Sequence, residues 1–158
     1  MLQNVAEKNG WHKFISMQGL YNLLYREEER EMNPFCKATG VGLLPWSPLA
    51  AGVLAHPWTD RTDAREQTDP FLKALFRTRE SSVDKAIVMR VEEVAKRLGA
   101  SMAQVAQAWI IAKGGTPICG LETVERINQA VSSLTVILTN DDILYLEELY
   151  QAKPAMPF

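Results

Sequence analysis

An aromatic residue, a hydroxyl residue and several small residues follow one another in the segment PWSPLAAG, residues 45–52. The apolar run 41–46, with the composition of a strand buried on both faces of a parallel sheet, leads into it. Ligands of α/β folds bind where such strands end, because loops and helix amino termini converge there. The indole of Trp46 could stack on a flat heterocycle, and the small residues would let backbone N–H groups approach a phosphate. Taken alone, the simpler interpretation is favoured, a proline-containing turn after a buried tryptophan.

A second candidate site follows the short apolar segment 116–119. A helix capped by Thr123 begins almost at once, with Arg126 in its first turn. Unpaired N–H groups, the positive end of the helix dipole and a guanidinium would together bind an anion. The spacing is equally consistent with an exposed arginine in a weak surface pair with Glu122 or Glu125.

The remaining polar side chains carry weaker signals. Gln18 ends another predicted strand and is by itself an ordinary polar strand end. His12 and His56 have no carboxylate or second ligand at a useful spacing, so we expect neither a metal site nor a catalytic triad. Cys36 and Cys119 lie in a predicted helix and a predicted strand, and we expect both to be buried, inert thiols.

The elements that must position these residues alternate between short apolar strands and amphipathic helices. Predicted strands cover 13–18, 41–46 and 116–119. The predicted helices cover 2–8, 34–39 with Asn33 as its cap, 84–98, a segment capped by Ser101 that reaches Ala112, 123–134, and 139–150. No periodicity is present from 47 to 82, which indicates a long loop. Strands separated by helices indicate βαβ crossovers and a parallel sheet.

Composition limits the class of protein. The chain has 158 residues, of which 47% are hydrophobic and 23% charged, as in one globular domain. The formal charge of -2, the absence of a long apolar run and the absence of a targeting segment lead us to expect no nucleic-acid partner, no membrane partner and a cytoplasmic location. Two cysteines form neither a disulfide framework nor a metal cluster. Three strands leave two hydrophobic sheet edges exposed, so self-association is expected.

In their order along the chain, these segments resemble the C-terminal half of an aldo-keto reductase, one of a family of (β/α)8-barrel oxidoreductases that use NADPH. The resemblance covers nearly the whole chain and is greatest to the microbial and fungal branch that is similar to potassium-channel β subunits. It is carried by SMQGLYNLLYREEEREMNPFCKATGVGLLPWSPLAAGVL, by SMAQVAQAWIIAKGGTPICGLETVERINQAV and by a helix-bearing tail. It implies an α/β fold in one domain over 1–158, a partial (β/α)8 TIM barrel with about the last three βα units and a C-terminal helix.

The resemblance also implies roles for individual residues. Gln18 would contact the nicotinamide carboxamide and Trp46 would stack on the nicotinamide ring. The pyrophosphate would be wrapped by the segment that contains Ser47, Pro48, Leu49, Ala50 and Gly52. The loop 55–82 would clamp the cofactor, and the tail 151–158 would be loose. The adenosine 2′-phosphate and the adenine would be held by Gly120, Thr123, Arg126 and Gln129, which favours NADPH over NADH.

The chain also departs from the family pattern. Glu122 stands where many relatives have a small hydroxyl residue, Ala130 replaces a common asparagine, and Gly19 replaces a polar residue. The catalytic aspartate, tyrosine, lysine and histidine of the family lie on the first four βα units, so the resemblance assigns no catalytic residue here, and neither Tyr21 nor Tyr25 matches one. We therefore expect a truncated reductase, inactive alone on its small-molecule carbonyl substrate. The alternatives are a non-catalytic NADP(H)-binding accessory half-barrel and a degenerate relic.

Overall fold

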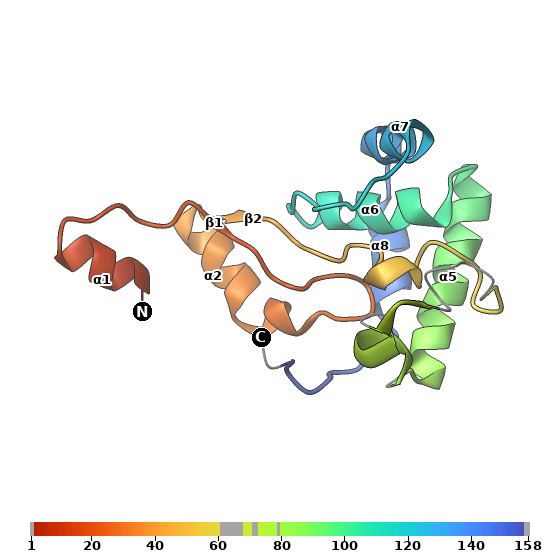
Figure 1. The fold of residues 1–158 in the computed structure, drawn as a ribbon, viewed down its shortest axis with the longest axis horizontal. Coiled ribbons are helices and arrows are strands. Elements are labelled where there is room, and N and C mark those ends of the chain that lie inside the picture. The colour runs from red at the N-terminus through yellow and green to blue at the C-terminus, as the bar shows by residue number, and fades with distance from the viewer. Residues whose placement is uncertain (1, 61–67, 71–72, 79, 157–158) are drawn as a thin grey trace.

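The structure of the protein, a computed structural model, describes residues 2–60, 68–70, 73–78 and 80–156. The strands are short, and helices form most of the regular secondary structure of the described residues (Figure 1). The strands are β1 (Ser16–Met17) and β2 (Gly42–Leu43). The α-helices are α1 (Leu2–Lys8), α2 (Met32–Thr39), α5 (Ser82–Leu98), α6 (Met102–Ala112), α7 (Val124–Ser132) and α8 (Asn140–Glu147). Single-turn helices are η1 (Glu27–Arg30), η2 (Ala50–Gly52), η3 (Lys73–Arg77, with π-helical bonding) and η4 (Ser133–Thr135).

Three chain segments run parallel, and the middle one contains β2. β1 pairs with β2 in the register Ser16 opposite Gly42, and isolated parallel bridges join Leu43 to Gly115 and Trp46 to Ile118. The predicted parallel arrangement of the three segments is therefore present. The strands predicted over 13–18 and 41–46 are only two residues long each, and 116–119 forms only bridges. The prediction that 41–46 is buried on both faces was wrong: Gly42 is exposed, and in this segment only Pro45 is buried.

Local capping residues fix most helix starts. Ser101 and Gln104 form the expected capping box at α6, Thr139 and Asp142 form one at α8, and Thr123 caps α7. The helix α5 begins two residues earlier than predicted, because Ser81 and Asp84 form a further capping box.

The helix α2 departs from the prediction at its start. It begins at Met32, its N-cap position is Glu31 without a side-chain cap, and the prediction of Asn33 as cap was wrong. Pro34 still falls in the first turn, where its missing N–H would have had no intrahelical acceptor. The helix ends as expected, with Gly40 in the left-handed conformation at φ 70°.

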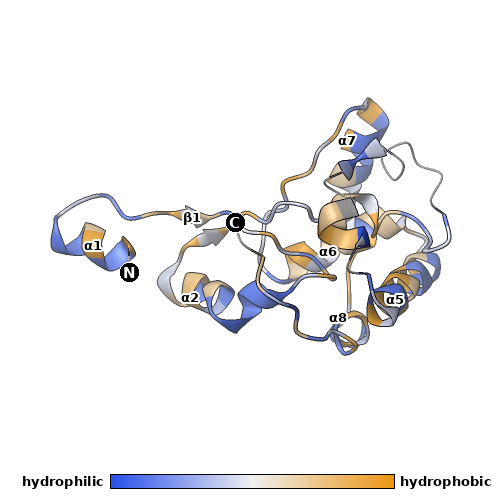
Figure 2. Cartoon of the chain, turned by 60° about the horizontal axis from the view of Figure 1, so that its bottom comes forward, coloured by the Kyte–Doolittle hydropathy of each residue, from blue (hydrophilic) through white to orange (hydrophobic). Residues whose placement is uncertain are grey.

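The core lies among α5, α6, α8 and the segments 20–25 and 50–54. Ile87, Val88, Val91 and Val94 of α5 are buried as the periodicity predicts. In Figure 2 most of α6 is apolar, and Trp109 at its centre is fully buried. The helix ends at Ala112 as predicted, and Ala112 itself is exposed.

Two parts of the molecule project from this core. α1, β1, β2 and α2 extend to one side of the helical cluster, and α7 stands apart from α5 and α8 (Figure 1). The helix α7 has no buried residue, and its apolar side chains remain exposed, as with Val124 at 67% and Val131 at 59%.

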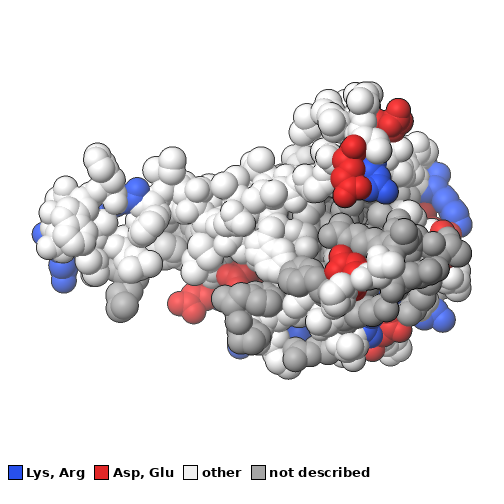
Figure 3. Space-filling view, in the orientation of Figure 1, with Lys and Arg blue, Asp and Glu red and all other residues white. Residues whose placement is uncertain are grey.

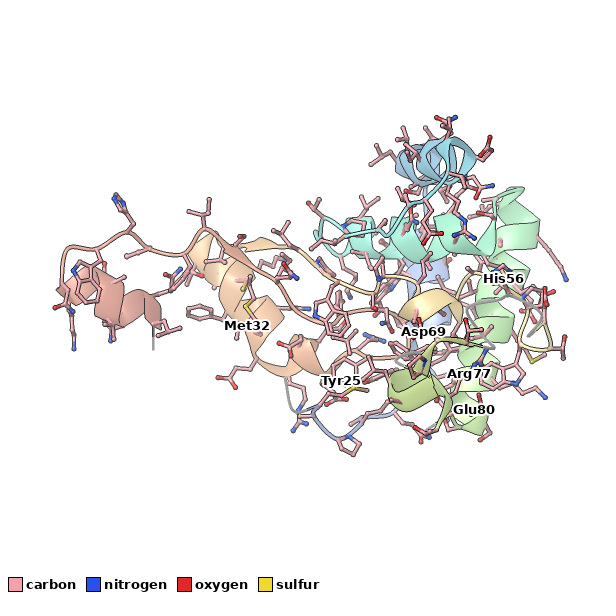
Figure 4. The ribbon with its side chains drawn as sticks, in the orientation of Figure 1. Tyr25, Met32, His56, Asp69, Arg77 and Glu80 are labelled. Atoms are coloured by element: carbon pink, nitrogen blue, oxygen red, sulfur yellow. The ribbon has the colours of Figure 1, made fainter. Side chains whose placement is uncertain are left out.

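The predicted long loop and the tail are described in part. Within 55–82 the structure describes 55–60, 68–70, 73–78 and 80–82, and η3 lies in this region; the remainder of the predicted loop lies outside the described residues. The tail 151–156 has no helix or strand, and 157–158 lie outside the described residues. The tail and η3 line a hollow of about 220 Å³ with Tyr25, which lies beside η3 in Figure 4.

Candidate cofactor site at the carboxyl edge

The three parallel segments end side by side, with Trp46 in the middle. Trp46 forms parallel bridges with Leu20 on one side and with Ile118 on the other. Its backbone N–H donates to the Gly19 carbonyl at 3.0 Å, and the Ile118 N–H donates to the Pro45 carbonyl at 2.8 Å. These pairings bring the ends of all three segments to one edge, as the parallel arrangement predicts.

Two predicted site residues offer accessible side chains at this edge. Gln18 is exposed directly after β1, and Trp46 is only partly buried although its backbone is bridged on both sides. Trp46 therefore combines a fixed backbone with a partly exposed side chain. An aromatic ring and an amide at the ends of neighbouring segments would suit a flat heterocycle that carries a polar substituent.

The chain after Trp46 turns sharply through the left-handed region. Ser47 has φ 52°, Ala50 49°, Ala51 55° and Gly52 105°. The turn is closed by hydrogen bonds from the Ala50 N–H to the Ser47 carbonyl, 3.0 Å, and from the Gly52 N–H to the Leu49 carbonyl, 2.9 Å. Left-handed conformations are costly for residues other than glycine, so the surrounding structure must hold this turn.

The predicted pyrophosphate-binding residues differ in their accessibility. Pro48 and Ala50 are buried, with Ala50 at 0% exposure, so they shape the turn and present no surface to a ligand. Ser47, Leu49 and Gly52 are partly exposed. Among the predicted pyrophosphate-binding residues of the turn, these three are therefore the ones that a ligand could reach.

Asn22 lies against this turn and was not among the residues selected from the sequence. It is fully buried, and its Nδ2 donates to the Ser47 carbonyl at 2.9 Å while its Oδ1 accepts from the Leu24 N–H at 2.9 Å. Its backbone exchanges hydrogen bonds with Tyr25, 3.1 and 3.0 Å. The signal was a polar residue inside the apolar segment LYNLLY, where a buried amide must find partners.

The predicted phosphate site lies at the amino terminus of α7. The Thr123 hydroxyl accepts from the Arg126 N–H at 3.2 Å, and Gly120, Arg126 and Gln129 are all exposed. The Arg126 guanidinium lies 4.0 Å from the Glu122 carboxylate, and both side chains are largely exposed. The weak surface pair is thus formed, and it leaves the guanidinium open to another anion. Figure 3 shows acidic and basic side chains in small mixed groups on the face that it displays.

A partly buried ionic cluster begins at Tyr21, directly after Leu20, which is bridged to Trp46. The Tyr21 hydroxyl donates to Glu29 at 2.5 Å, and Arg26 binds both Glu29 at 2.7 Å and Glu147 at 2.9 Å. Burial and the neighbouring Glu29 carboxylate raise the pKa of Tyr21 far above the usual range. Although burial alone would raise the pKa of Glu29, hydrogen bonds from Arg26 and Tyr21 lower it. The Tyr21 phenol is therefore committed to Glu29 and is a poor proton donor for a substrate.

The histidines and cysteines form no further centre in the part of the chain that the structure describes. His12 is exposed and His56 partly buried, and no three His, Cys, Asp or Glu side chains among the described residues are grouped to hold a metal ion. Cys36 is buried as expected, whereas Cys119 is only partly buried. Burial, and for Cys36 also the nearby Glu28, raises the pKa of both thiols. No helix in the described ranges is long and apolar enough to cross a bilayer.

The chain is similar to known proteins over nearly its whole length. The aldo/keto reductase family model matches residues 1–151. The chain is 55% identical over 157 residues to versiconal hemiacetal acetate reductase of Aspergillus parasiticus and 53% identical over 154 residues to a putative aryl-alcohol dehydrogenase of Schizosaccharomyces pombe, covering 99% and 97% of this chain and 46% of each relative.

A solved structure gives the same result for the fold. A thermostable aldo-keto reductase matches with a TM-score of 0.66 and 22% identity over 95% of this chain and 46% of its own. The chain thus spans about half the length of the relatives that it matches. The predicted fold class, a partial (β/α)8 barrel, is confirmed. The matches in sequence and in fold identify the chain as a member of the aldo/keto reductase family.

Proposed function

We propose that this chain binds NADP(H) at the carboxyl edge of its three parallel segments, as the cofactor-holding part of a reductase that acts on an aldehyde or ketone. The observation that carries the proposal is Trp46, whose backbone is bridged on both sides at the edge where the exposed Gln18 also lies, and which is only partly buried. When bound, NADPH supplies a hydride to a carbonyl carbon.

The residues present fit such a cofactor. Trp46 would support one face of the nicotinamide ring and Gln18 would hydrogen-bond its carboxamide. Ser47 and Gly52 lie in a turn whose left-handed backbone brings the chain close to where a pyrophosphate would pass. These residues would bind and orient the cofactor. None of these residues is assigned a proton-transfer role. The Tyr21 phenol is not assigned one either, because it is already bound to Glu29.

The amino terminus of α7 would recognise the 2′-phosphate. The Arg126 guanidinium is exposed, and its 4.0 Å pairing with Glu122 is too weak to compete with a phosphate dianion. Glu122 would oppose the same phosphate by charge repulsion. The two side chains should therefore affect cofactor affinity in opposite directions.

Calorimetric titration of the purified chain with NADPH tests the proposal. We expect saturable binding that weakens about tenfold in Trp46→Ala, because stacking and burial of one ring face are lost. Trp11→Ala is the matched control, since Trp11 is 65% exposed and lies just beyond α1. Absence of saturable binding by the unmodified chain, or equal affinity of the Trp46→Ala variant, would contradict the proposal.

A second pair of variants tests the phosphate site. Arg126→Gln should weaken NADPH binding about tenfold with little effect on NADH, because only NADPH carries the 2′-phosphate. Glu122→Gln should strengthen NADPH binding roughly threefold by removing a repulsive charge. If either variant changed the affinity for NADPH and for NADH equally, the amino terminus of α7 would not be the site that binds the 2′-phosphate.

Turnover separates cofactor binding from catalysis. The chain alone, mixed with NADPH and 4-nitrobenzaldehyde, should show no reduction, because none of the residues that we assign here donates a proton. The names of two relatives, a versiconal hemiacetal acetate reductase and a putative aryl-alcohol dehydrogenase, favour carbonyl compounds as the substrate class of the reductase. Cofactor oxidation that Trp46→Ala abolishes would show that this chain supplies a proton donor of its own.

A further inference from the structure

The turn after Trp46 is held in an unfavourable backbone conformation by contacts outside itself. Ser47, Ala50 and Ala51 all have positive φ, and none of them is glycine. The hydrogen bonds within the turn join Ala50 to Ser47 and Gly52 to Leu49, and these also form in ordinary turns. A further restraint on Ser47 must therefore favour the left-handed form.

Asn22 supplies that restraint. Its Nδ2 donates to the Ser47 carbonyl at 2.9 Å across a sequence separation of 25 residues. The other end of the amide is occupied, because Oδ1 accepts from the Leu24 N–H at 2.9 Å. With 0% exposure and a backbone paired to Tyr25, the side chain has one fixed orientation.

We infer that Asn22 is a positioning residue for cofactor binding: its amide fixes the left-handed conformation of Ser47, and so directs the turn that leaves Trp46. The expected effect on NADP(H) binding rests on the proposed function. Asn22 is fully buried, and its one side-chain bond to the turn is the one to the Ser47 carbonyl, so it would act on the cofactor through that carbonyl.

A double-mutant cycle between Asn22→Ala and Ser47→Gly separates this role from core packing. Asn22→Ala should weaken NADPH binding about tenfold, because the turn loses the bond that favours its bound form. Glycine accepts positive φ without steric cost, so in the Ser47→Gly background the same substitution should cost roughly threefold or less. A merely structural asparagine would cause the same loss in both backgrounds, and that result would overturn the inference.

Tyr25→Phe is the matched control. The Tyr25 hydroxyl accepts from the Met156 N–H at 3.1 Å, so this variant also loses a partly buried hydrogen bond in the same 22–25 segment. The bond between Asn22 and Ser47 stays intact, and NADPH affinity should change by less than about twofold. A tenfold loss in Tyr25→Phe would attribute the effect to general loosening and would overturn the inference.

Hydrogen–deuterium exchange tests the turn without any cofactor. Asn22→Ala should speed exchange of the amides in 47–54 while the amides of α6 stay protected, and Ser47→Gly should reduce that difference. Asn22→Asp, which keeps the acceptor for Leu24 and replaces the amide donor, should act in the same direction if the alanine variant fails to fold. Failure of the unmodified chain to bind NADPH would refute the proposed function, whereas unchanged exchange in 47–54 would refute the role of Asn22.

Discussion

Replacement of Glu147, at the end of α8, should destabilise the fold by an amount that the structure lets us work out. Its carboxylate accepts from the Trp109 indole N–H at 2.8 Å and lies 2.9 Å from Arg26 and 3.0 Å from Lys113. Its side chain is 15% exposed, and Trp109 is fully buried. One carboxylate thus joins α8, α6 and the segment that precedes η1.

The expected cost of Glu147→Ala has two parts. The indole N–H of Trp109 would be left buried without this acceptor, which costs about 1–3 kcal/mol. Arg26 would lose one carboxylate but keep Glu29 at 2.7 Å, so its share is smaller than the ~3–5 kcal/mol of a fully broken buried pair. A total of about 3–4 kcal/mol follows. Glu147→Gln keeps an acceptor for the indole and should cost about 1–2 kcal/mol.

Equilibrium urea unfolding, followed by far-ultraviolet circular dichroism, measures these differences. Glu148→Gln is the neighbouring control, because its pair with Arg90 at 2.6 Å is formed by a side chain that is 49% exposed and should contribute under about 1 kcal/mol. The reasoning is refuted if Glu147→Ala and Glu147→Gln are equally destabilising, or if Glu148→Gln costs as much as Glu147→Ala.

Three further results are expected. Ser101→Ala should lower the free energy of unfolding by about 1 kcal/mol in the same urea assay, through loss of the capping box of α6. The stabilisation from the lowered pKa of Glu29 is present above its ordinary value of 4.5 and is lost as pH falls through the lowered value, so Glu29→Gln should flatten the acid limb of a stability–pH curve. We also propose that the open edge beside β1 drives self-association, and Ile15→Lys, at a residue 84% exposed, should shift sedimentation toward monomer.

Features that depend on neighbouring residues were predictable from the sequence. The caps at Ser101, Thr123 and Thr139 were found because a cap and its target lie three residues apart. The buried face of α5 followed from its helical period. The prediction of Asn33 as a cap failed because α2 starts at Met32, one residue before Asn33.

Features that depend on distant partners were not predictable. The segments 41–46 and 116–119 have the composition of buried strands, yet strand length and burial are set by what pairs with them and covers them. Asn22 was missed for the same reason, since its target, Ser47, lies 25 residues away. The positions of Gln18 and Trp46 at one edge could be predicted from the parallel topology. The burial of Ala50 could not, because it depends on the conformation of the folded turn.

The tail has a practical consequence for handling the protein. Its backbone N–H groups at Lys153 and Met156 donate to Glu27 at 2.6 Å and to the Tyr25 hydroxyl at 3.1 Å, and the Lys153 ammonium pairs with Asp84 at 2.5 Å. These bonds attach the tail to Tyr25, to η1 through Glu27 and to α5 through Asp84. An affinity tag or a protease cut close behind residue 150 would therefore disturb the contacts that the tail makes with Tyr25, η1 and α5, so purification handles are better placed ahead of α1.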